Sequence, residues 1–253
     1  MRQHLRALGD LLLPRTCLVC GRTLGVHEEH LCLACAADVP YTGFWREVHN
    51  PLADRFNEVI ERHRGTEPAD YAYAVALMYY QGGYKEIPKS LKYHGNLAAG
   101  RYYGAMLGKH LAAAPHFADV DLVIPVPLHW TRRWSRGYNQ AEVLARAVAQ
   151  ELGAACRPDL LVRARRTRTQ THLSGEEKAR NVASAFQVRR WPVGAGYDEP
   201  RHILLLDDTF TTGSTLYACY AALRSVTKAR ISVAALTAVE GDTGARPGGL
   251  SGR

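Results

Sequence analysis

The sequence predicts an α/β protein in which helices cover a doubly wound, mostly parallel sheet, with a small cysteine-rich module at the N-terminus. Three observations predict this class. Short apolar runs alternate with helical segments, as in repeated strand–helix–strand units. Two of these runs, 121–124 and 203–206, are unbroken, which is typical of strands buried on both faces of a parallel sheet. Two Cys-x-x-Cys pairs precede the first expected strand.

The expected elements follow one another without a long linker. Pro51 suits the first turn of a helix, where its missing N–H costs nothing, and Gly65 suits the end of that helix. Tyr, Val, Leu and Met over 71–80 favour a strand. In chain order we expect a helix at 2–13, a cysteine-rich segment at 15–43, helices at 51–64, 85–93, 97–114, 139–152 and 216–223, and strands at 71–80, 121–124, 203–206 and 231–239.

These elements divide the chain into three parts. Residues 1–45 form an N-terminal helix and the cysteine module, 46–240 form the α/β domain, and the Gly-rich residues 241–253 form a flexible tail. With 47% hydrophobic and 22% charged residues among 253, the chain has an ordinary globular composition. Its apolar stretches are shorter than the roughly 18 residues of a membrane-spanning helix, and Asp10 interrupts the one near the N-terminus. We therefore expect a cytoplasmic location without membrane insertion.

The positive charge is concentrated in one stretch. The net charge of the chain is +8, and residues 129–190 alone hold thirteen Lys and Arg against five Asp and Glu. Such a stretch suits a groove for phosphate and pyrophosphate or a track for a nucleic-acid backbone. A solvated basic face without a ligand is the third interpretation.

Four cysteines predict a structural zinc site. Cys17 and Cys20 form one Cys-x-x-Cys pair, and Cys32 and Cys35 form a second after eleven intervening residues. Each pair can present two thiolates to one face, and two pairs complete the tetrahedral shell that closes zinc to solvent. Redox-active dithiols or disulfides are the alternative, and a cytoplasmic location disfavours the disulfides.

The other candidate ligands and thiols are expected to be secondary. His27 and His30 lie between the cysteine pairs and could replace a thiolate. Cys156 and Cys219 are isolated in apolar helical surroundings, where we expect them to serve as small buried hydrophobic residues.

Two adjacent acids follow the apolar run 203–206. Asp207 and Asp208 stand where a buried parallel strand would end, which is the edge at which such sheets bind ligands. Carboxylates in this place can accept hydrogen bonds from the hydroxyl groups of a sugar. The chain carries neither a Gly-x-x-x-x-Gly-Lys-Ser/Thr loop nor a Gly-x-Gly-x-x-Gly turn after a strand, so other nucleotide sites are not indicated.

A turn rich in threonine and glycine comes next. Thr211 or Thr212 can cap the following helix, and Gly213 lets the backbone approach a ligand closely. Backbone N–H groups and the positive end of the helix then converge on an anion. Together with the acids, this turn predicts a site for a phosphorylated sugar.

A second anion site is expected after the run 121–124. Pro125 and Pro127 direct the chain out of the sheet, and a basic loop follows. Its arginines offer forked donors that suit the oxygens of pyrophosphate; they are Arg132, Arg133 and Arg136. Trp130 and Trp134 are expected to pack this loop down, with stacking on a base as the alternative.

The segment 161–170 is too basic and too polar for a core. It fits a mobile flap that folds over an anionic ligand, with Arg165 and Arg166 near its middle. Arg180 and Asn181 begin a short helix whose apolar end, 182–186, anchors it; an ordinary surface cation is the alternative for Arg180.

The run from His202 to Thr215 resembles the signature by which type I phosphoribosyltransferases bind phosphoribosyl pyrophosphate (PRPP). The resemblance implies that two acids hold the ribose and that the Thr/Gly turn holds the 5′-phosphate. It departs from the usual pattern at Thr209, where valine or isoleucine is commoner. The residues so implied are Asp207, Asp208, Thr209, Thr211, Thr212, Gly213, Ser214 and Thr215.

Taken in order, the motifs from Cys17 to about Val239 resemble the ComF family. That family joins a zinc ribbon to a type I phosphoribosyltransferase domain and is associated with competence for DNA uptake. The resemblance implies that His129, Arg132 and Arg133 hold pyrophosphate. It also implies that Lys92 and the 165–170 flap, with Arg165 and Arg166, close over the ligand.

Two functional hypotheses follow. In the first, the protein is a phosphoribosyltransferase in which Mg²⁺ bridges PRPP and the arginines stabilise departing pyrophosphate, with an unidentified acceptor. In the second, it is a non-catalytic accessory protein that keeps a pocket for PRPP or ribose 5-phosphate and uses its ribbon and basic face on single-stranded DNA or DNA-uptake proteins. A transcriptional regulator is disfavoured because no helix-turn-helix stands out.

Overall fold

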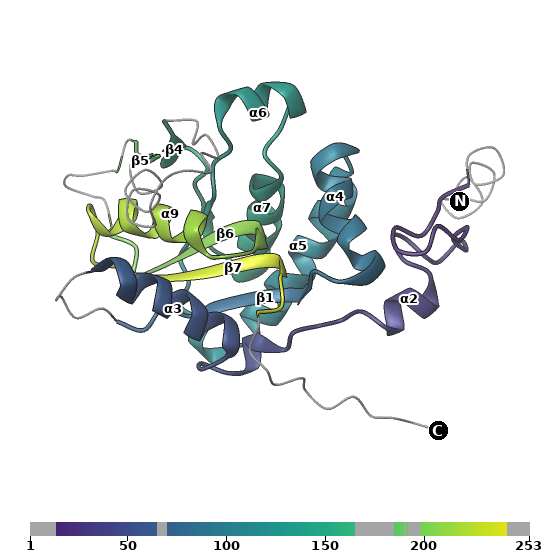
Figure 1. The fold of residues 1–253 in the computed structure, drawn as a ribbon, viewed down its shortest axis with the longest axis horizontal. Helices are drawn as coiled ribbons and strands as arrows, with labels where there is room; N and C mark the ends of the chain where they lie inside the picture. The colour runs from purple at the N-terminus through teal and green to yellow at the C-terminus, as the bar shows by residue number, and fades with distance from the viewer. Residues whose placement is uncertain (1–13, 65–69, 165–184, 190, 192–197, 242–253) are drawn as a thin grey trace.

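The computed structural model describes residues 14–64, 70–164, 185–189, 191 and 198–241, and its centre is a five-stranded sheet (Figure 1). The strand order is β1-β7-β6-β2-β3, and every neighbouring pair is parallel. The predicted parallel α/β class is therefore confirmed. The strands are β1 (Ala74–Tyr79), β2 (Leu122–Pro125), β3 (Ala155–Cys156), β6 (His202–Phe210) and β7 (Arg230–Ala238).

Helices cover both faces of this sheet. α3 (Pro51–Arg64) and α9 (Ser214–Arg224) pack on one face, and α4 (Glu86–Tyr93), α5 (Leu97–Ala112) and α7 (Gln140–Leu152) pack on the other (Figure 1). Side chains of β6 alternate between the two cores, with Leu205 in the first and Leu206 in the second. Burial on both faces explains the unbroken apolar runs of the sequence.

The boundary between β2 and β6 is the topological switch point of the sheet. From β2 the chain continues outward to β3 through α7, and from β6 it continues the other way to β7 through α9. Helices that leave in opposite directions open a crevice beyond the carboxyl ends of the two central strands. The predicted site residues that follow β2 and those at the end of β6 therefore lie at the same edge of the sheet.

β6 is longer than the sequence suggested. The register with β2 ends at Pro125 opposite Leu206, whereas the register with β7 continues to Phe210 opposite Ala238. The expectation that the strand would stop at Leu206 is wrong, because pairing with β7 carries it through both acids. Beyond Leu206, the pairing of β6 with β2 has ended, while its pairing with β7 continues.

The basic segment after β2 also differs from expectation. Instead of an irregular loop it forms the helix α6 (Trp130–Arg136). The His129 side chain accepts a hydrogen bond from the Thr131 N–H at its start, and Gly137 ends it with φ 78°. A capping side chain and a left-handed glycine are standard helix boundaries, which explains the difference.

The flap segment is only partly described. Its stem is an antiparallel pair, β4 (Leu161–Arg163) and β5 (Phe186–Val188). Arg165, Arg166, Gln170 and the Arg180–Asn181 pair lie outside the described residues. The expected helix at 2–13 and the tail from 242 onward lie outside them as well.

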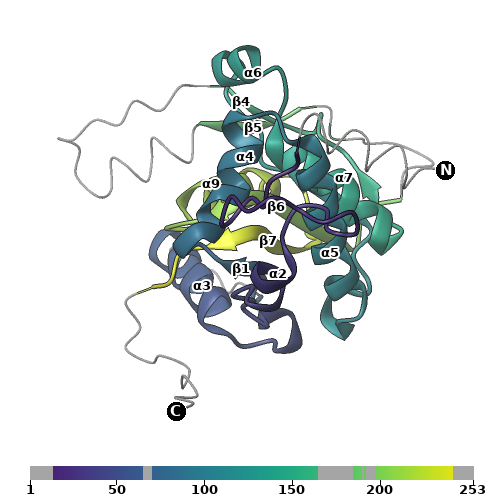
Figure 2. The same cartoon turned by 90° about the vertical axis from the view of Figure 1, so that its right-hand side faces the viewer.

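The cysteine-rich segment lies on the outer side of α4, as both views show (Figures 1 and 2). It contains an antiparallel bridge between Thr16 and Thr23 and the short helix α2 (Leu33–Ala37). The 3₁₀ turn η1 (Phe44–Arg46) follows it in the chain. A second 3₁₀ turn, η2 (Gly82–Lys85), lies between β1 and α4 and contacts the segment where Gly83 meets Val19. Across the described parts of the chain, helices with the length and apolar character for crossing a membrane are absent.

Candidate functional site

The four predicted zinc ligands converge. The sulfur atoms of Cys17, Cys20, Cys32 and Cys35 all lie within 4.8 Å of one another. The Cys20 and Cys32 sulfurs are 3.7 Å apart, close to the edge of about 3.8 Å that follows from tetrahedral Zn–S bonds of about 2.3 Å. All four are free thiols, so the disulfide alternative does not describe this cluster. The arrangement supports structural zinc.

The electrostatics of the cluster also favour a cation. A hydrogen bond from the Cys35 backbone, with further help from Arg22, lowers the pKa of Cys32 to about 6. Burial and the neighbouring thiols raise the pKa of Cys35. Without a metal the four groups cannot all ionise together, whereas zinc would stabilise all four as thiolates.

The histidines and the remaining cysteines lie apart from this cluster. The His30 ring packs against Tyr102, with centroids 5.0 Å apart, and within the described residues the metal-binding group consists of the four cysteines. Cys219 is buried, as expected. Cys156 is half-buried in β3 rather than in helical surroundings, and burial raises its pKa to about 11.

Strand alternation turns the two acids of β6 in opposite directions. Asp208 turns toward the face of α4, where its Oδ1 lies 3.0 Å from Lys92 Nζ. Lys92 Nζ also lies 3.5 Å from the Thr209 hydroxyl, which accepts a hydrogen bond from Thr237. The structure thus brings together Lys92, Asp208 and Thr209, which stand far apart in the sequence.

Among the described residues, one carboxylate oxygen of this group has no hydrogen-bond partner. Asp208 is 4% exposed, and its Oδ2 is buried without a hydrogen-bond partner in the part of the chain that the structure describes. A buried carboxylate oxygen without a partner is costly, so such atoms are usually paired. This oxygen can still accept a hydrogen bond or bind a cation.

Asp207 has an unusual acidity. Burial, followed by the neighbouring Asp208 charge, raises the pKa of Asp207 to about 7, while Lys92 and Arg163 act in the opposite direction. The Asp208 N–H donates to Asp207 Oδ1 over 2.8 Å. Arg163 lies on β4 with its guanidinium 5.3 Å above the Phe186 ring. The sequence placed Arg163 in a flap, and its effect on Asp207 was not predicted.

The turn after β6 is shaped by Gly213. This residue has φ 78°, and a Cβ atom there would lie 2.9 Å from the Phe210 ring. Gly213 is also the N-cap of α9, so the expectation that Thr211 or Thr212 caps this helix is wrong. The Thr212 hydroxyl accepts only a long hydrogen bond, of 3.4 Å, from the Ser214 N–H. The first N–H groups of α9 lack partners within the helix, as at every helix start.

Arg55 holds this turn from α3. Its guanidinium donates to the Thr211 carbonyl over 2.7 Å and to the Val239 carbonyl over 2.9 Å, and it lies 5.5 Å from the Phe210 ring centroid. Sequence reasoning missed this residue. An arginine on an amphipathic helix 156 residues from its partner carries no local signal.

In the predicted pyrophosphate segment, His129 is buried, whereas Arg133 and both tryptophans are exposed. His129 is 6% exposed and caps α6. The Arg133 side chain is 64% exposed and lies 3.9 Å from Glu142. The side chain of Arg132 lies outside the described part. Trp130 and Trp134 are 69% and 88% exposed, so the expectation that they pack the loop down is wrong.

The end of α6 and the residues that follow it contact α4 and α7. The Tyr138 hydroxyl donates to the Leu91 carbonyl, and the Arg136 guanidinium lies 5.4 Å from the Tyr93 ring centroid. Asn139 caps α7 and donates to the Val126 carbonyl over 3.0 Å. This part of the Arg-Gly-Tyr-Asn-Gln motif therefore joins β2, α4 and α7.

A cavity of about 640 Å³ lies between α6 and the flap stem. Trp130 and Arg133 line one side, and Arg163 and Arg189 line the other. The structure thus brings the predicted anion loop and the flap stem together around one space.

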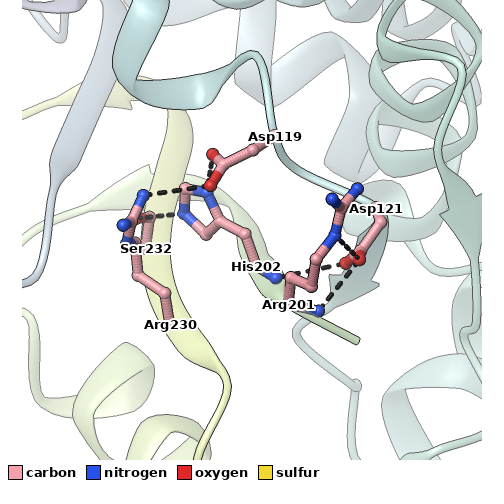
Figure 3. A network of polar contacts seen from close by, with 6 residues as sticks. All are labelled: Asp119, Asp121, Arg201, His202, Arg230 and Ser232. Atoms are coloured by element: carbon pink, nitrogen blue, oxygen red, sulfur yellow. Dashed lines mark hydrogen bonds and ion pairs between the residues drawn. The ribbon is translucent and has the colours of Figure 1, made fainter. Parts of the chain in front are cut away.

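A second polar network lies at the opposite end of the sheet (Figure 3). The fully buried His202 joins Asp119 Oδ1 and Ser232 Oγ, each over 2.7 Å. The arrangement resembles a serine–histidine–aspartate triad, but Ser232 is fully buried at the amino end of β7. Burial lowers the pKa of His202, so its role is to satisfy polar groups under the sheet.

Comparison with known proteins finds similarity both for the cysteine-rich segment and for most of the chain. The pattern of a double zinc ribbon domain matches residues 8–44. Competence protein F of Haemophilus influenzae is 26% identical over 223 residues, which cover 86% of this chain and 94% of that protein. The chain is thus similar to a competence protein over most of its length and to a double zinc ribbon over its N-terminal part.

Two further relatives carry the name DNA utilization protein YhgH. The protein of Salmonella typhi is 38% identical over 96 residues, which cover 38% of this chain and 40% of that protein's length. The protein of Escherichia coli O157:H7 is 27% identical over 203 residues, which cover 79% of this chain and 80% of that protein.

Proposed function

We propose that this protein belongs to the ComF family and binds a phosphorylated ribose, PRPP or ribose 5-phosphate, at the carboxyl edge of β6. The observation that carries the proposal is the buried Asp208 Oδ2, which has no hydrogen-bond partner within the described residues. A ribose hydroxyl would donate to this oxygen, and the turn from Thr211 to Thr215 would hold the phosphate at the start of α9. The division into a ribbon at 1–45 and a binding domain at 46–240 belongs to this proposal.

The acids suit Mg²⁺ that arrives with the sugar. Mg²⁺ prefers oxygen ligands and commonly uses one or two carboxylates together with substrate phosphates. Asp207 and Asp208 would supply the oxygens, and the Oδ2 of Asp208 lacks a partner among the described residues. When bound, the metal would neutralise part of the charge on pyrophosphate.

The side chains of the protein would bind and orient rather than react covalently. Lys92 offsets the charge of Asp208, and Asp207 can hold a proton until a cation or sugar binds. Arg133, together with Arg132, Arg165 and Arg166, would stabilise the departing pyrophosphate as oxocarbenium character develops at C1′. Transfer to an acceptor is the enzymatic form of the proposal.

Calorimetry with PRPP, ribose 5-phosphate and Mg²⁺ tests the binding site. Asp208→Asn keeps the size of the side chain but removes its charge, and we expect it to lose most of the binding heat. Asp121→Asn is the matched control, because Asp121 accepts from the His202 N–H at the opposite end of the sheet. Absence of heat with the zinc-loaded wild type, or equal binding by both variants, would overturn the proposal.

Pyrophosphate release tests turnover separately. The protein is incubated with PRPP, Mg²⁺ and a panel of nitrogenous acceptors, and pyrophosphate is measured. Release with at least one acceptor, lost in Asp208→Asn, is expected of a transferase. Binding without release from any acceptor would leave the accessory interpretation.

Exposed tryptophans favour a second candidate function, the binding of single-stranded DNA. Trp130 and Trp134 lie one helical turn apart on α6, and Arg133 lies beside them. Exposed aromatic rings next to arginines provide the stacking and phosphate contacts that single strands use. The names of the relatives, Competence protein F and DNA utilization protein, agree with a role in DNA uptake.

A titration of a fluorescent single strand at two salt concentrations tests this candidate. Trp134→Ala should weaken binding by about 1–3 kcal/mol, the usual contribution of one stacked base, and higher salt should weaken it further. Val226→Ala is the control, because Val226 is another exposed apolar residue, 40% exposed, after α9. Equal binding by Trp134→Ala and wild type would refute this function.

A further inference from the structure

We infer that Tyr84 is a positioning residue through which the zinc ribbon holds Lys92 against Asp208. The inference rests on the proposed function for its effect on the ligand, but the contacts that carry it are independent of any ligand. They form a continuous path from a cysteine of the cluster to the acid pair.

The path begins at the last zinc ligand. The Tyr84 hydroxyl donates to the backbone carbonyl of Cys35 over 2.9 Å. Both residues are half-buried, so solvent competes only weakly for this bond. Because zinc would fix Cys35, it would also fix the carbonyl that Tyr84 contacts.

A second contact lies one residue before Tyr84. A Cβ atom on Gly83 would lie 2.8 Å from both the side chain and the carbonyl oxygen of Val19, so the two backbones are in close contact. Val19 and Leu31 pack both in the small core of the ribbon and against the core beneath α4 and α5. The ribbon is therefore packed onto the domain and fixes the η2 turn at two adjacent residues.

The η2 turn passes this constraint to Lys92. It ends at Lys85, and α4 begins at Glu86 without an intervening residue. Lys92 is in the last turn of α4, two helical turns from Tyr84. A short, continuous helix transmits a shift at its start to its end as a rigid element.

The other end of α4 is held by different residues. Tyr138 donates to the Leu91 carbonyl, and Arg136 lies over the Tyr93 ring. Lys92 stands between these two contacts, with its Nζ 3.0 Å from Asp208. The helix is thus fixed by the ribbon through the η2 turn that precedes it, and by Arg136 and Tyr138 at its last turn. Loss of the first contact would let α4 pivot about the second.

The test compares Tyr84→Phe with Tyr41→Phe in the full-length, zinc-loaded protein. Tyr41 also joins the ribbon side to the domain, but through α5: its hydroxyl donates to Met106 Sδ over 3.2 Å, and its ring lies 6.2 Å from that of His110. We expect Tyr84→Phe to weaken PRPP binding by up to about fivefold, the equivalent of about 1 kcal/mol for one hydrogen bond, without loss of zinc. Tyr41→Phe should bind as wild type does.

Two further readouts separate positioning from general stability. Hydrogen exchange at residues 86–93 should become faster in Tyr84→Phe and after zinc chelation, while exchange in α7 stays unchanged. In a Lys92→Met background, Tyr84→Phe should cause no further loss of PRPP affinity, because the residue through which it acts is gone.

The outcomes are distinguishable. Unchanged exchange in α4 would overturn the inference whatever the ligand does, and so would an additive effect of Tyr84→Phe in the Lys92→Met background. Faster exchange in α4 alone, with no PRPP binding by wild type, would support the positioning role and refute the proposed function.

Discussion

Replacing Gly213 by alanine tests how the turn after β6 is built. The residue adopts φ 78°, and a Cβ atom there would lie 2.9 Å from Phe210 Cζ. Phe210 cannot move away easily, because it is 1% exposed and lies between Arg55 and Phe56. The left-handed backbone costs alanine about 1–2 kcal/mol and the tight contact a further 1–3 kcal/mol, so the total loss of stability should be about 2–5 kcal/mol.

Gly153→Ala separates the two contributions. Gly153 has φ 66° at the end of α7, and a Cβ atom on this residue would have no neighbour within 4 Å. Only the backbone penalty of about 1–2 kcal/mol should therefore remain. Urea unfolding followed by tryptophan fluorescence gives both free energies by linear extrapolation.

The expected result is a larger loss for Gly213→Ala than for Gly153→Ala, by about 1–3 kcal/mol. Gly213→Ala should also lose PRPP binding under conditions in which it is still folded, because the turn and the start of α9 must shift. Equal losses for both variants would refute the close contact with Phe210. Unchanged PRPP affinity in folded Gly213→Ala would refute the assignment of this turn to the phosphate.

Three further predictions concern pH and metal. Because the pKa of Asp207 is raised to about 7, protons should compete with the ligand for this carboxylate. Calorimetry should then show that the affinity for PRPP–Mg²⁺ rises between pH 6 and 8 more steeply in wild type than in Asp207→Asn. Parallel pH profiles of the two proteins would contradict this. Burial lowers the pKa of His202, so unfolding takes up a proton and the free energy of unfolding should fall as pH drops below about 6.5. The urea midpoint should therefore shift less with pH in His202→Gln than in wild type. Identical shifts would argue against a neutral His202. Cys32→Ser should bind less zinc by metal analysis and should loosen the ribbon, whereas full zinc content would exclude Cys32 as a ligand.

The sequence specified the class of the fold because its signals are local. Apolar runs such as 203–206 record burial on both faces of a strand, and Pro51 marks a helix start that the structure places at the same residue. The two Cys-x-x-Cys pairs likewise predict the four metal ligands from their spacing alone, and the four sulfur atoms converge in the structure. Each of these signals depends on residues that are neighbours in the chain.

Boundaries set by pairing were less predictable. β6 extends to Phe210 only because β7 lies beside it, and the sequence of β6 alone shows a change from apolar to acidic residues at Asp207. α6 was expected as a loop, because its arginines suggested exposure and its cap by His129 is an uncommon one. The site roles of Arg132, Arg165 and Arg166 stay predictions.

The sequence by itself determined the residues of the candidate site, with a pair of acids, a Thr/Gly turn and a four-cysteine cluster written as short motifs. Only the tertiary structure decided how they are held: Lys92 against Asp208, Arg55 on the Thr211 carbonyl, and Tyr84 on the Cys35 carbonyl. The physical reason is that each of these contacts joins elements distant in the chain. Their geometry follows from packing around the sheet, and no local pattern of residues encodes it.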